Sequence, residues 1–224
     1  MGGLFWDGRS PSLQNQAGEP FLNPVEMGNP DTCAVVMKIR RAPYYSELVR
    51  IYGETSNADS LYAHITDALA AYQQSDEVNP FSSKYDAWEK GEYAFTDSEL
   101  RGMNLFKDKG MCAECHVLDK DERAGRVLFT DHTYDNLGIP RNQENPHLRV
   151  PTDYFLLTSD SIDLGLGAIV SKEEENGKFR VPTLRNIALT APYGHNGYFK
   201  TLREIVHFYN CLLYTSPSPR YTER

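Results

Sequence analysis

Residues 112–116 read Cys112-Ala113-Glu114-Cys115-His116, and this stretch decides how the rest of the chain is interpreted. Two thiols spaced in this way and followed at once by an imidazole are the three groups that a covalently bound c-type haem requires. The thiols add across the vinyl groups of the porphyrin, and the histidine binds the iron as its proximal ligand. The motif therefore predicts a haem c held by Cys112, Cys115 and His116.

Two other chemistries use a close cysteine pair, and the surrounding sequence disfavours both. A thioredoxin-like redox pair belongs in a βαβ unit, and the chain has no such pattern. A four-cysteine zinc site needs a second close pair, and the other cysteines, Cys33 and Cys211, lie far apart in the chain. Cys33 is expected to be a buried helix residue without a function.

Composition excludes several classes of protein. The 224 residues carry a formal net charge of −8, and the absence of a basic stripe argues against binding to nucleic acid. No apolar run reaches the length of a membrane span. The first residues also lack the charged start and apolar stretch of a signal peptide. Because bacterial haem c is attached outside the cytoplasmic membrane, we expect a periplasmic parent protein whose signal peptide has been lost by truncation.

The fold class is predicted to be mostly α. Apolar residues recur at helical spacing in segments that begin near Thr32, Tyr44, Ser60, Thr96 and Thr201. The first thirty residues are interpreted as ordered loop with short helical turns, residues 79–91 as a linker, and residues 117–181 as long loops with a few short helices. No alternating strand pattern of any length is present in the sequence.

The segment from Ser60 to Gln74 is the clearest amphipathic helix of the chain. Its buried face is predicted to consist of Leu61, Ile65, Ala68, Leu69 and Tyr72.

The second axial ligand of the haem is not the usual methionine. All five methionines, Met1, Met27, Met37, Met103 and Met111, precede Cys112. The remaining candidates downstream are His132, His147, His195, His207, several tyrosines, or an open position on the iron. Spacing alone does not choose among them.

The C-terminal residues 211–224 have an unusual sequence. They resemble the in-frame translation of a transposase-derived sequencing adapter, and in that case they did not evolve as protein and Cys211 has no role. A natural disordered tail is the alternative.

Three segments of the chain resemble the bacterial di-haem cytochrome c peroxidases and MauG-like proteins. They are residues 4–17 with 23–28, residues 105–116 with 136–140, and residues 181–197 with the helix that runs to Tyr209. Their order along residues 4–210 carries more weight than any one of them.

The resemblance implies two cytochrome c-like domains. Residues 1–90 resemble the latter part of an N-terminal peroxidatic domain, and residues 91–210 resemble the C-terminal domain with its haem. The haem motif of the first domain would lie upstream of Met1, so the chain is interpreted as a fragment. Because both haem pockets would be incomplete, the fragment alone is expected to be inactive.

The resemblance also assigns roles to three residues near the N-terminus. Trp6 resembles the tryptophan that passes electrons between the two haems. Gln16 and Glu26 resemble the residues above the peroxide-binding haem, where a carboxylate can move a proton between the two peroxide oxygens and an amide can orient the peroxide. Apart from the resemblance, Gln16 and Glu26 are interpreted as ordinary surface residues.

Three further positions follow from the third segment. Thr190 and Pro192 resemble the pair whose backbone carbonyls bind a Ca²⁺ ion between the domains, with a plain Thr-Ala-Pro turn as the alternative. His195 is expected to lie near the haem without binding the iron.

Tyr209 stands where the peroxidases carry the methionine that binds the second haem, and MauG-like proteins carry tyrosine there. A phenolate is a hard anionic ligand that favours ferric over ferrous iron and lowers the potential of the haem. The implied function is a di-haem peroxidase of the MauG type. It would use hydrogen peroxide together with a small cytochrome, a cupredoxin or an oxidised protein substrate. The alternative is a mono-haem electron carrier without peroxidase activity.

Overall fold

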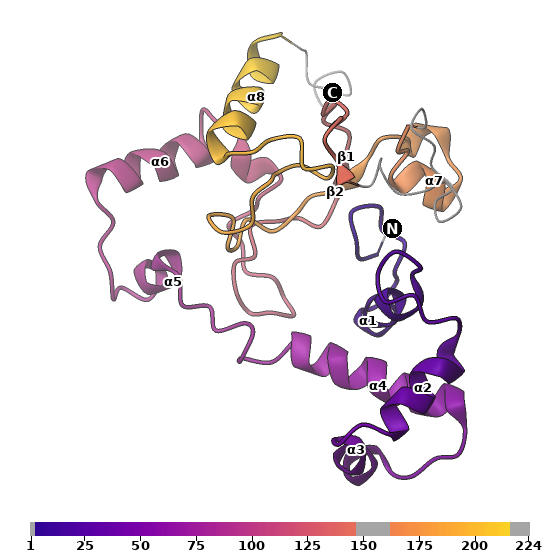
Figure 1. Ribbon diagram of the computed structural model, residues 1–224. Helices are drawn as coiled ribbons and strands as arrows, with labels where there is room; N and C mark the ends of the chain where they lie inside the picture. The colour runs from indigo at the N-terminus through magenta and orange to yellow at the C-terminus, as the bar shows by residue number, and fades with distance from the viewer. Residues whose placement is uncertain (1–2, 147–161, 216–224) are drawn as a thin grey trace.

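The structure is a computed structural model that describes residues 3–146 and 162–215, with side chains described as far as Cys211. The fold is mostly helical, which confirms the predicted class (Figure 1). The α-helices are α1 (Leu13–Leu22), α2 (Thr32–Arg40), α3 (Tyr45–Tyr52), α4 (Ala58–Gln73), α5 (Lys84–Glu89), α6 (Asp97–Lys107), α7 (Leu166–Val170) and α8 (Leu202–Thr215). Short 3-10 helices cover Cys112–Glu114 and Glu173–Glu175. Strands β1 (Tyr134–Asp135) and β2 (Phe179–Arg180) form one antiparallel pair.

The first four helices form a unit of their own in the lower part of Figure 1. Its core is Val36 of α2 packed against Leu61 and Ile65 of α4. The predicted face of α4 is correct at Leu61 and Ile65 but wrong at Leu69 and Tyr72, which are 37% and 50% exposed. The neighbours α1 and α2 both pack on α4, so one stripe of that helix is buried and the adjoining positions remain in water.

Helix α1 corrects the interpretation of the first thirty residues as loop. The Ser12 side chain accepts a hydrogen bond from the backbone N–H of Asn15 and so caps the ten-residue helix. Pro20 lies inside this helix and cannot donate a backbone hydrogen bond, and such residues usually indicate a break. The helix forms because its buried residues, Ala17 and Gly18, pack closely on α4; the hydroxyl of Tyr62 donates to the carbonyl of Gly18 at 2.8 Å.

The prediction that Cys33 is buried is also wrong. Cys33 occupies an exposed position in α2, two residues before Val35, the first of the buried pair Val35 and Val36. The helix turns its apolar stripe toward α4, and Cys33 falls outside that stripe.

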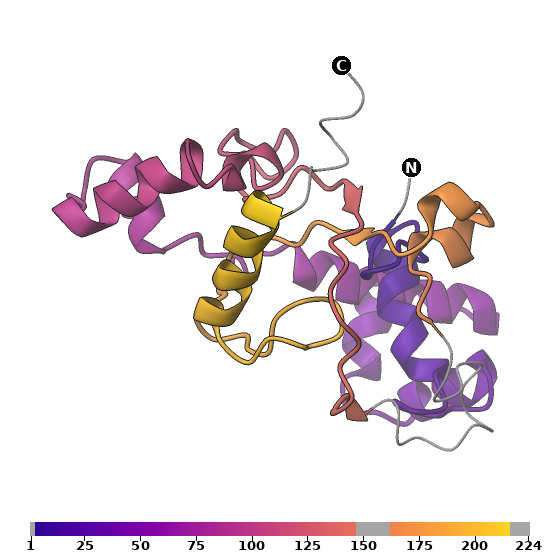
Figure 2. The same cartoon turned by 90° about the horizontal axis from the view of Figure 1, so that it is seen from above.

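The second unit begins with two helices that start at strong caps. Ser83 with Asp86 forms a capping box at the start of α5, and Thr96 with Glu99 forms another at the start of α6. The first of these places a helix inside the segment that the sequence predicts to be a linker. Figure 2 shows α6 and α8 in the half of the molecule that lies away from α1 to α4.

The N-terminal turn, residues 3–10, joins the two units. The hydroxyl of Tyr134 in β1 donates to the carbonyl of Gly3 at 2.6 Å. The backbone N–H of Arg180 in β2 donates to the carbonyl of Trp6 at 2.8 Å. Trp6 therefore lies at the junction of the units, in contact with the sheet of the second one.

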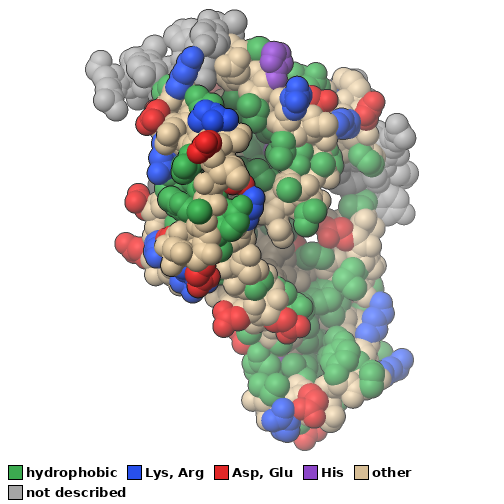
Figure 3. Space-filling view, turned by 90° about the vertical axis from the view of Figure 1, so that its left-hand side faces the viewer, with side chains coloured by type: hydrophobic (Ala, Val, Ile, Leu, Met, Phe, Trp, Pro, Cys, Tyr) green, Lys and Arg blue, Asp and Glu red, His purple; other side chains and the backbone are tan. Residues whose placement is uncertain are grey.

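Hydrophobic side chains are conspicuous on the surface of the α1–α4 unit, in the lower part of Figure 3. In this unit the side chains of Met37, Ile51 and Tyr72 are 55%, 64% and 50% exposed. None of the helices in the described part of the chain has both the length and the hydrophobicity that a bilayer crossing requires.

Candidate haem c site

The cysteine motif follows α6 through a tight reversal. The backbone N–H of Gly110 donates to the carbonyl of Leu105 at 2.7 Å, and Met111 adopts a left-handed conformation with φ of 54°. A Cβ atom at Gly110 would lie 2.6 Å from the carbonyl oxygen of Leu105, so only glycine fits this position. The reversal leads directly into the 3-10 helix Cys112–Glu114, which begins at the first cysteine of the motif and has the second, Cys115, as its C-cap.

His116 is oriented by the loop that follows it. Its Nδ1 lies 2.9 Å from the carbonyl oxygen of Phe129, an acceptor, so Nδ1 carries the proton and donates. This leaves Nε2 with the lone pair that a metal ion requires. Burial lowers the pKa of His116, which favours the neutral imidazole.

Tyr209 lies on α8 at the same site. Burial, together with the neighbouring Cys115 thiol, Asp135 carboxylate and Cys112 thiol, raises the pKa of Tyr209 to about 12. The Cys115 thiol also contacts Asp135 Oδ2 at 3.7 Å. The phenol of Tyr209 therefore lies within electrostatic reach of both cysteines of the motif, although α8 and the motif are far apart in the chain.

These groups fit a haem c. The thiols lie at the start and at the C-cap of one short 3-10 helix, the imidazole presents an unprotonated nitrogen, and a partly buried phenol comes from another helix. Both cysteines are partly accessible and neither is in a disulfide. Thiols in this state can react with the vinyl groups of a porphyrin, and an imidazole with a phenol is a chemically reasonable pair of iron ligands.

An ion pair anchors the segment around His116 to α5. Arg185 donates to both carboxylate oxygens of Asp86, at 2.6 Å and 3.0 Å, and Asp86 is only 2% exposed. The guanidinium also donates from Nε to the carbonyl of Val127 at 2.9 Å. Although burial opposes ionisation, the hydrogen bonds from Arg185 and Ser83 lower the pKa of Asp86 to about 2.

This pair predicts an acid-sensitive contribution to stability. Asp86 has a folded pKa of about 2 against a reference value of 3.8. Its contribution is thus complete above about pH 4 and is lost as the pH falls through about 2, with a size of about 2 kcal/mol. Chemical denaturation at several pH values measures this. Asp86→Asn should show a correspondingly smaller loss between pH 4 and pH 2, and identical slopes in the two proteins would contradict the assignment.

The residues predicted near the N-terminus occupy three successive places. Trp6 lies in the turn before α1, Gln16 lies on α1, and Glu26 lies in the turn after it. Among the described residues, the Oε1 atom of Gln16 is a buried acceptor without a hydrogen-bond partner. Glu26 is exposed, and its Oε1 accepts from Asn23 Nδ2 at 2.7 Å. An unsatisfied buried amide is the kind of group that a bound polar molecule would satisfy.

The predicted calcium residues lie in an exposed turn. Thr190 and Pro192 flank Ala191, and all three are exposed. In the part of the chain that the structure describes, no cluster of three or more histidine, cysteine, aspartate or glutamate side chains could hold a metal ion. A calcium site here would therefore depend on backbone carbonyls and on oxygen ligands from elsewhere.

The remaining histidines have other contacts. His195 stacks on Phe179 of β2, with ring centroids 3.5 Å apart and planes within 6° of parallel, and burial lowers its pKa. His132 contacts Asp121 and Arg180. His207 is exposed and contacts Cys211. His147 lies outside the described residues, as do residues 216–224 of the tail.

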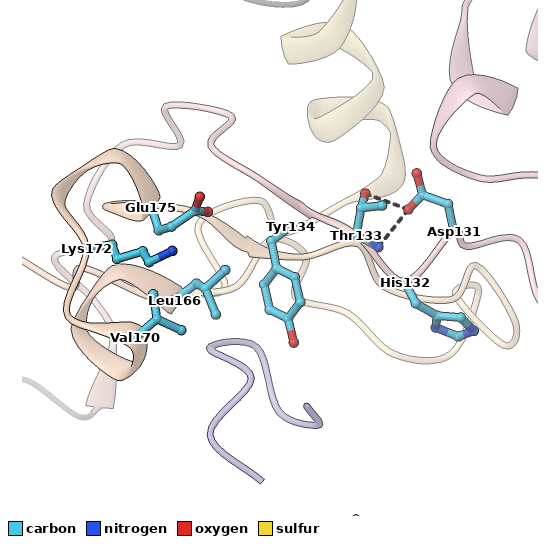
Figure 4. Close-up of a pocket in the computed structure, with 8 residues that line it drawn as sticks. All are labelled: Asp131, His132, Thr133, Tyr134, Leu166, Val170, Lys172 and Glu175. Carbon is cyan, nitrogen blue, oxygen red and sulfur yellow. Dashed lines mark hydrogen bonds between the residues drawn. The ribbon is translucent and has the colours of Figure 1, made fainter. Parts of the chain in front are cut away.

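A surface cavity of about 390 Å³ lies between β1 and α7 (Figure 4). It is lined by Tyr134, Leu166 and Val170 together with polar residues that include His132, Lys172 and Glu175. Among the residues that the sequence analysis considers for a site, His132, one of the candidate axial ligands, lines this cavity. A second cavity of about 310 Å³ has a mostly apolar lining that includes Tyr85, Met103 and Phe129, and it lies against the loop that holds His116.

Sequence reasoning missed several residues that shape the site. Phe129 acts through its backbone carbonyl, Asp135 through its contact with Cys115, and the Asp86–Arg185 pair through the loop between them. Of these residues, only Arg185 could have been singled out from the sequence, because it lies within residues 181–197, the third segment that resembles the di-haem peroxidases.

This chain is mostly helical and carries a Cys-x-x-Cys-His motif at a short helical turn, with a tyrosine from another helix beside it. Such an arrangement is typical of the c-type cytochromes and their relatives. Comparison with known proteins narrows this class. Residues 1–94 match the family model of the di-haem cytochrome c peroxidases. The chain is 41% identical over 223 residues to the methylamine utilization protein MauG of Paracoccus denitrificans, which covers 97% of this chain and 55% of that protein.

Two further matches agree. Cytochrome c peroxidase Ccp of Escherichia coli is 32% identical, over 88% of this chain and 37% of that protein. The crystal structure of the di-haem peroxidase BthA from Burkholderia thailandensis superposes with a TM-score of 0.80 at 36% identity, over 94% of this chain and 52% of that one. The chain belongs to the di-haem cytochrome c peroxidase and MauG family, whose members carry covalent haem c. It spans about half the length of these relatives or less.

Proposed function

We propose that this chain is the part of a di-haem peroxidase that holds the electron-relay haem, with Tyr209 in place of methionine as the second iron ligand. Haem c supplies a redox-active iron when it is bound. Cys112 and Cys115 would attach the porphyrin, and His116 Nε2 and the phenol oxygen of Tyr209 would bind the iron.

The observation that carries this proposal is the burial of Tyr209 beside the thiols of the motif. Burial of the phenol beside the Asp135 carboxylate and the thiols of the motif keeps it protonated, as its pKa of about 12 indicates. A ferric ion is a strong Lewis acid and favours the phenolate, so binding of the iron would release the proton. The resulting anionic ligand would stabilise the ferric state and lower the potential.

We assign the peroxide chemistry to the N-terminal segment. Glu26 would take a proton from one oxygen of the peroxide and return it to the other, which assists cleavage of the bond between them. Gln16 would hold the peroxide by hydrogen bonding, and its unpaired buried Oε1 is consistent with that role. Trp6, at the junction of the two units, would pass electrons between the haem sites.

Three smaller assignments belong to the same proposal. Thr190 and Pro192 would give backbone carbonyls to a calcium ion between the domains. His195 would pack near the haem through its stack on Phe179. The protein would work in the periplasm, because haem c is attached there.

A steady-state assay with hydrogen peroxide and reduced cytochrome c, performed on the product of the complete gene, tests the function. We favour MauG-like oxidation of a protein partner over detoxification, because a low-potential relay haem accepts electrons poorly from a high-potential cytochrome. Slow turnover with cytochrome c and peroxide-dependent oxidation of a protein substrate are therefore expected. Fast turnover with cytochrome c would contradict the MauG-like assignment.

A mono-haem electron carrier is the second candidate, since this chain contains a single Cys-x-x-Cys-His motif. The gene sequence that precedes the codon for Met1 distinguishes the two. A second Cys-x-x-Cys-His motif within about one hundred residues, roughly one domain, supports the peroxidase. A signal peptide directly before Met1 supports the carrier.

A further inference from the structure

The carbonyl group that orients His116 belongs to a loop that several side-chain hydrogen bonds hold in place. This loop, residues 127–130, is called the proximal loop below. Phe129 lies at its centre and accepts the hydrogen bond from His116 Nδ1 at 2.9 Å. Phe129 has a positive φ of 55°, a conformation that a bulky residue adopts only when its surroundings enforce it. The position of the Phe129 carbonyl is therefore set by whatever holds the loop.

Residues 181–185 supply two of the anchors. The hydroxyl of Thr183 donates to the carbonyl of Leu128 at 2.5 Å. The hydroxyl of Thr130 donates in the opposite direction, to the carbonyl of Val181 at 2.7 Å, and this bond is buried. Each side of Phe129 is thus tied to the same segment.

Arg185 supplies the third anchor and connects it to α5. Its guanidinium donates to the carbonyl of Val127 from Nε and from a terminal nitrogen, at 2.9 Å and 2.5 Å. Its two terminal nitrogens, including the one that donates to Val127, bind the carboxylate of Asp86, which is 2% exposed. The cation also lies 5.2 Å from the centroid of the Phe129 ring. The guanidinium of Arg185 therefore contacts the proximal loop both at its backbone and at its central side chain.

Stability alone does not account for such a pair. Removing two charges from water costs several kcal/mol per ion, and apolar residues of similar volume often stabilise a protein equally well or better. A bidentate arginine fixes direction as well as distance, which a hydrophobic contact does not. The pair is thus better suited to holding one atom in place than to adding stability.

We propose that Asp86 and Arg185 are positioning residues that set the redox potential of the haem by holding the Phe129 carbonyl on His116 Nδ1. A carbonyl that accepts from Nδ1–H increases the basicity of the opposite nitrogen, and a more basic ligand stabilises ferric iron. A loosened loop would weaken the hydrogen bond and make the haem easier to reduce. This inference rests on the proposed attachment of haem at His116.

The test compares midpoint potentials of the haem-loaded protein and its variants. Arg185→Lys keeps the positive charge but loses the fork that spans Asp86 and Val127. We expect the potential to rise, with about a tenfold change in the equilibrium constant for reduction, or about 59 mV for one electron. Thr183→Val, which removes only the bond to Leu128, should shift the potential in the same direction by less. Tyr62→Phe removes a comparable hydrogen bond in the α1–α4 unit and should leave the potential unchanged.

The outcomes separate three explanations. A purely electrostatic effect of Arg185 predicts no shift in Arg185→Lys, and a purely structural role predicts lower stability with an unchanged potential. Either result would overturn the proposal. If Arg185→Lys does not fold, Thr183→Val carries the same test, and an unchanged potential there overturns it. A parent protein that binds no covalent haem would overturn the proposed function and this inference together.

Discussion

Replacing Cys112 and Cys115 together by alanine is expected to abolish covalent haem attachment to this 224-residue chain completely. Cys112 begins a short 3-10 helix and Cys115 is its C-cap, and thioether formation requires the sulfur atoms themselves. Acidified acetone extracts haem that is held only by coordination and leaves thioether-linked haem on the chain, so the haem that remains measures attachment. Each single alanine variant should retain one thioether, which shifts the absorption of its pyridine adduct in alkali.

Cys33 provides a matched control, because it is an exposed thiol in α2 and lies in the other unit. Cys33→Ala should carry as much covalent haem as the parent. If the double variant of this chain, which has no other Cys-x-x-Cys-His motif, still held haem that resisted extraction, attachment through Cys112 and Cys115 would be refuted.

The second large effect is expected at Glu26. Glu26→Gln keeps the size and the hydrogen-bonding capacity of the side chain but removes the proton acceptor. General acid–base catalysis contributes about 10²- to 10⁴-fold, so the rate of peroxide consumption should fall by a factor in that range. This corresponds to about 3–5 kcal/mol of lost transition-state stabilisation. The measurement is the initial rate of peroxide loss for the product of the complete gene.

Glu47 offers the comparison, since it is an exposed carboxylate in the same unit and pairs only at the surface with Arg50. Glu47→Gln should retain the parent rate. A Glu26→Gln variant within a factor of two of the parent would show that another group transfers the proton.

Local signals in the sequence predict much of the helical structure. The capping box of Thr96 and Glu99 and the glycine at position 53, with its φ of 83°, act within a few residues, and both mark helix ends in the structure. Where the sequence misleads, tertiary packing is responsible. Helix α1 forms despite Pro20, and Cys33 and Tyr72 are exposed because the neighbouring helices determine which stripe of each helix is buried.

The candidate site likewise combines residues that the local sequence predicts with residues that only the fold brings together. The motif could be predicted because its three groups lie within five residues. Tyr209 came from a resemblance, since no spacing rule singles out one tyrosine on a helix so far from the motif. The Asp86–Arg185 pair joins residues 99 positions apart and acts on His116 through a backbone carbonyl, so no side-chain pattern reports it.

The ligation of the iron by Tyr209 is the central claim about this chain, and one spectroscopic comparison tests it most directly. The ferric absorption and resonance Raman spectra of the haem-loaded parent should be compared with those of Tyr209→Phe. Tyr198→Phe serves as the control, because Tyr198 is a surface aromatic that is 40% exposed. Tyrosine ligation predicts phenolate vibrations in the parent and in the control, with their loss and a changed ferric spectrum in Tyr209→Phe. An unchanged ferric spectrum in Tyr209→Phe would contradict it.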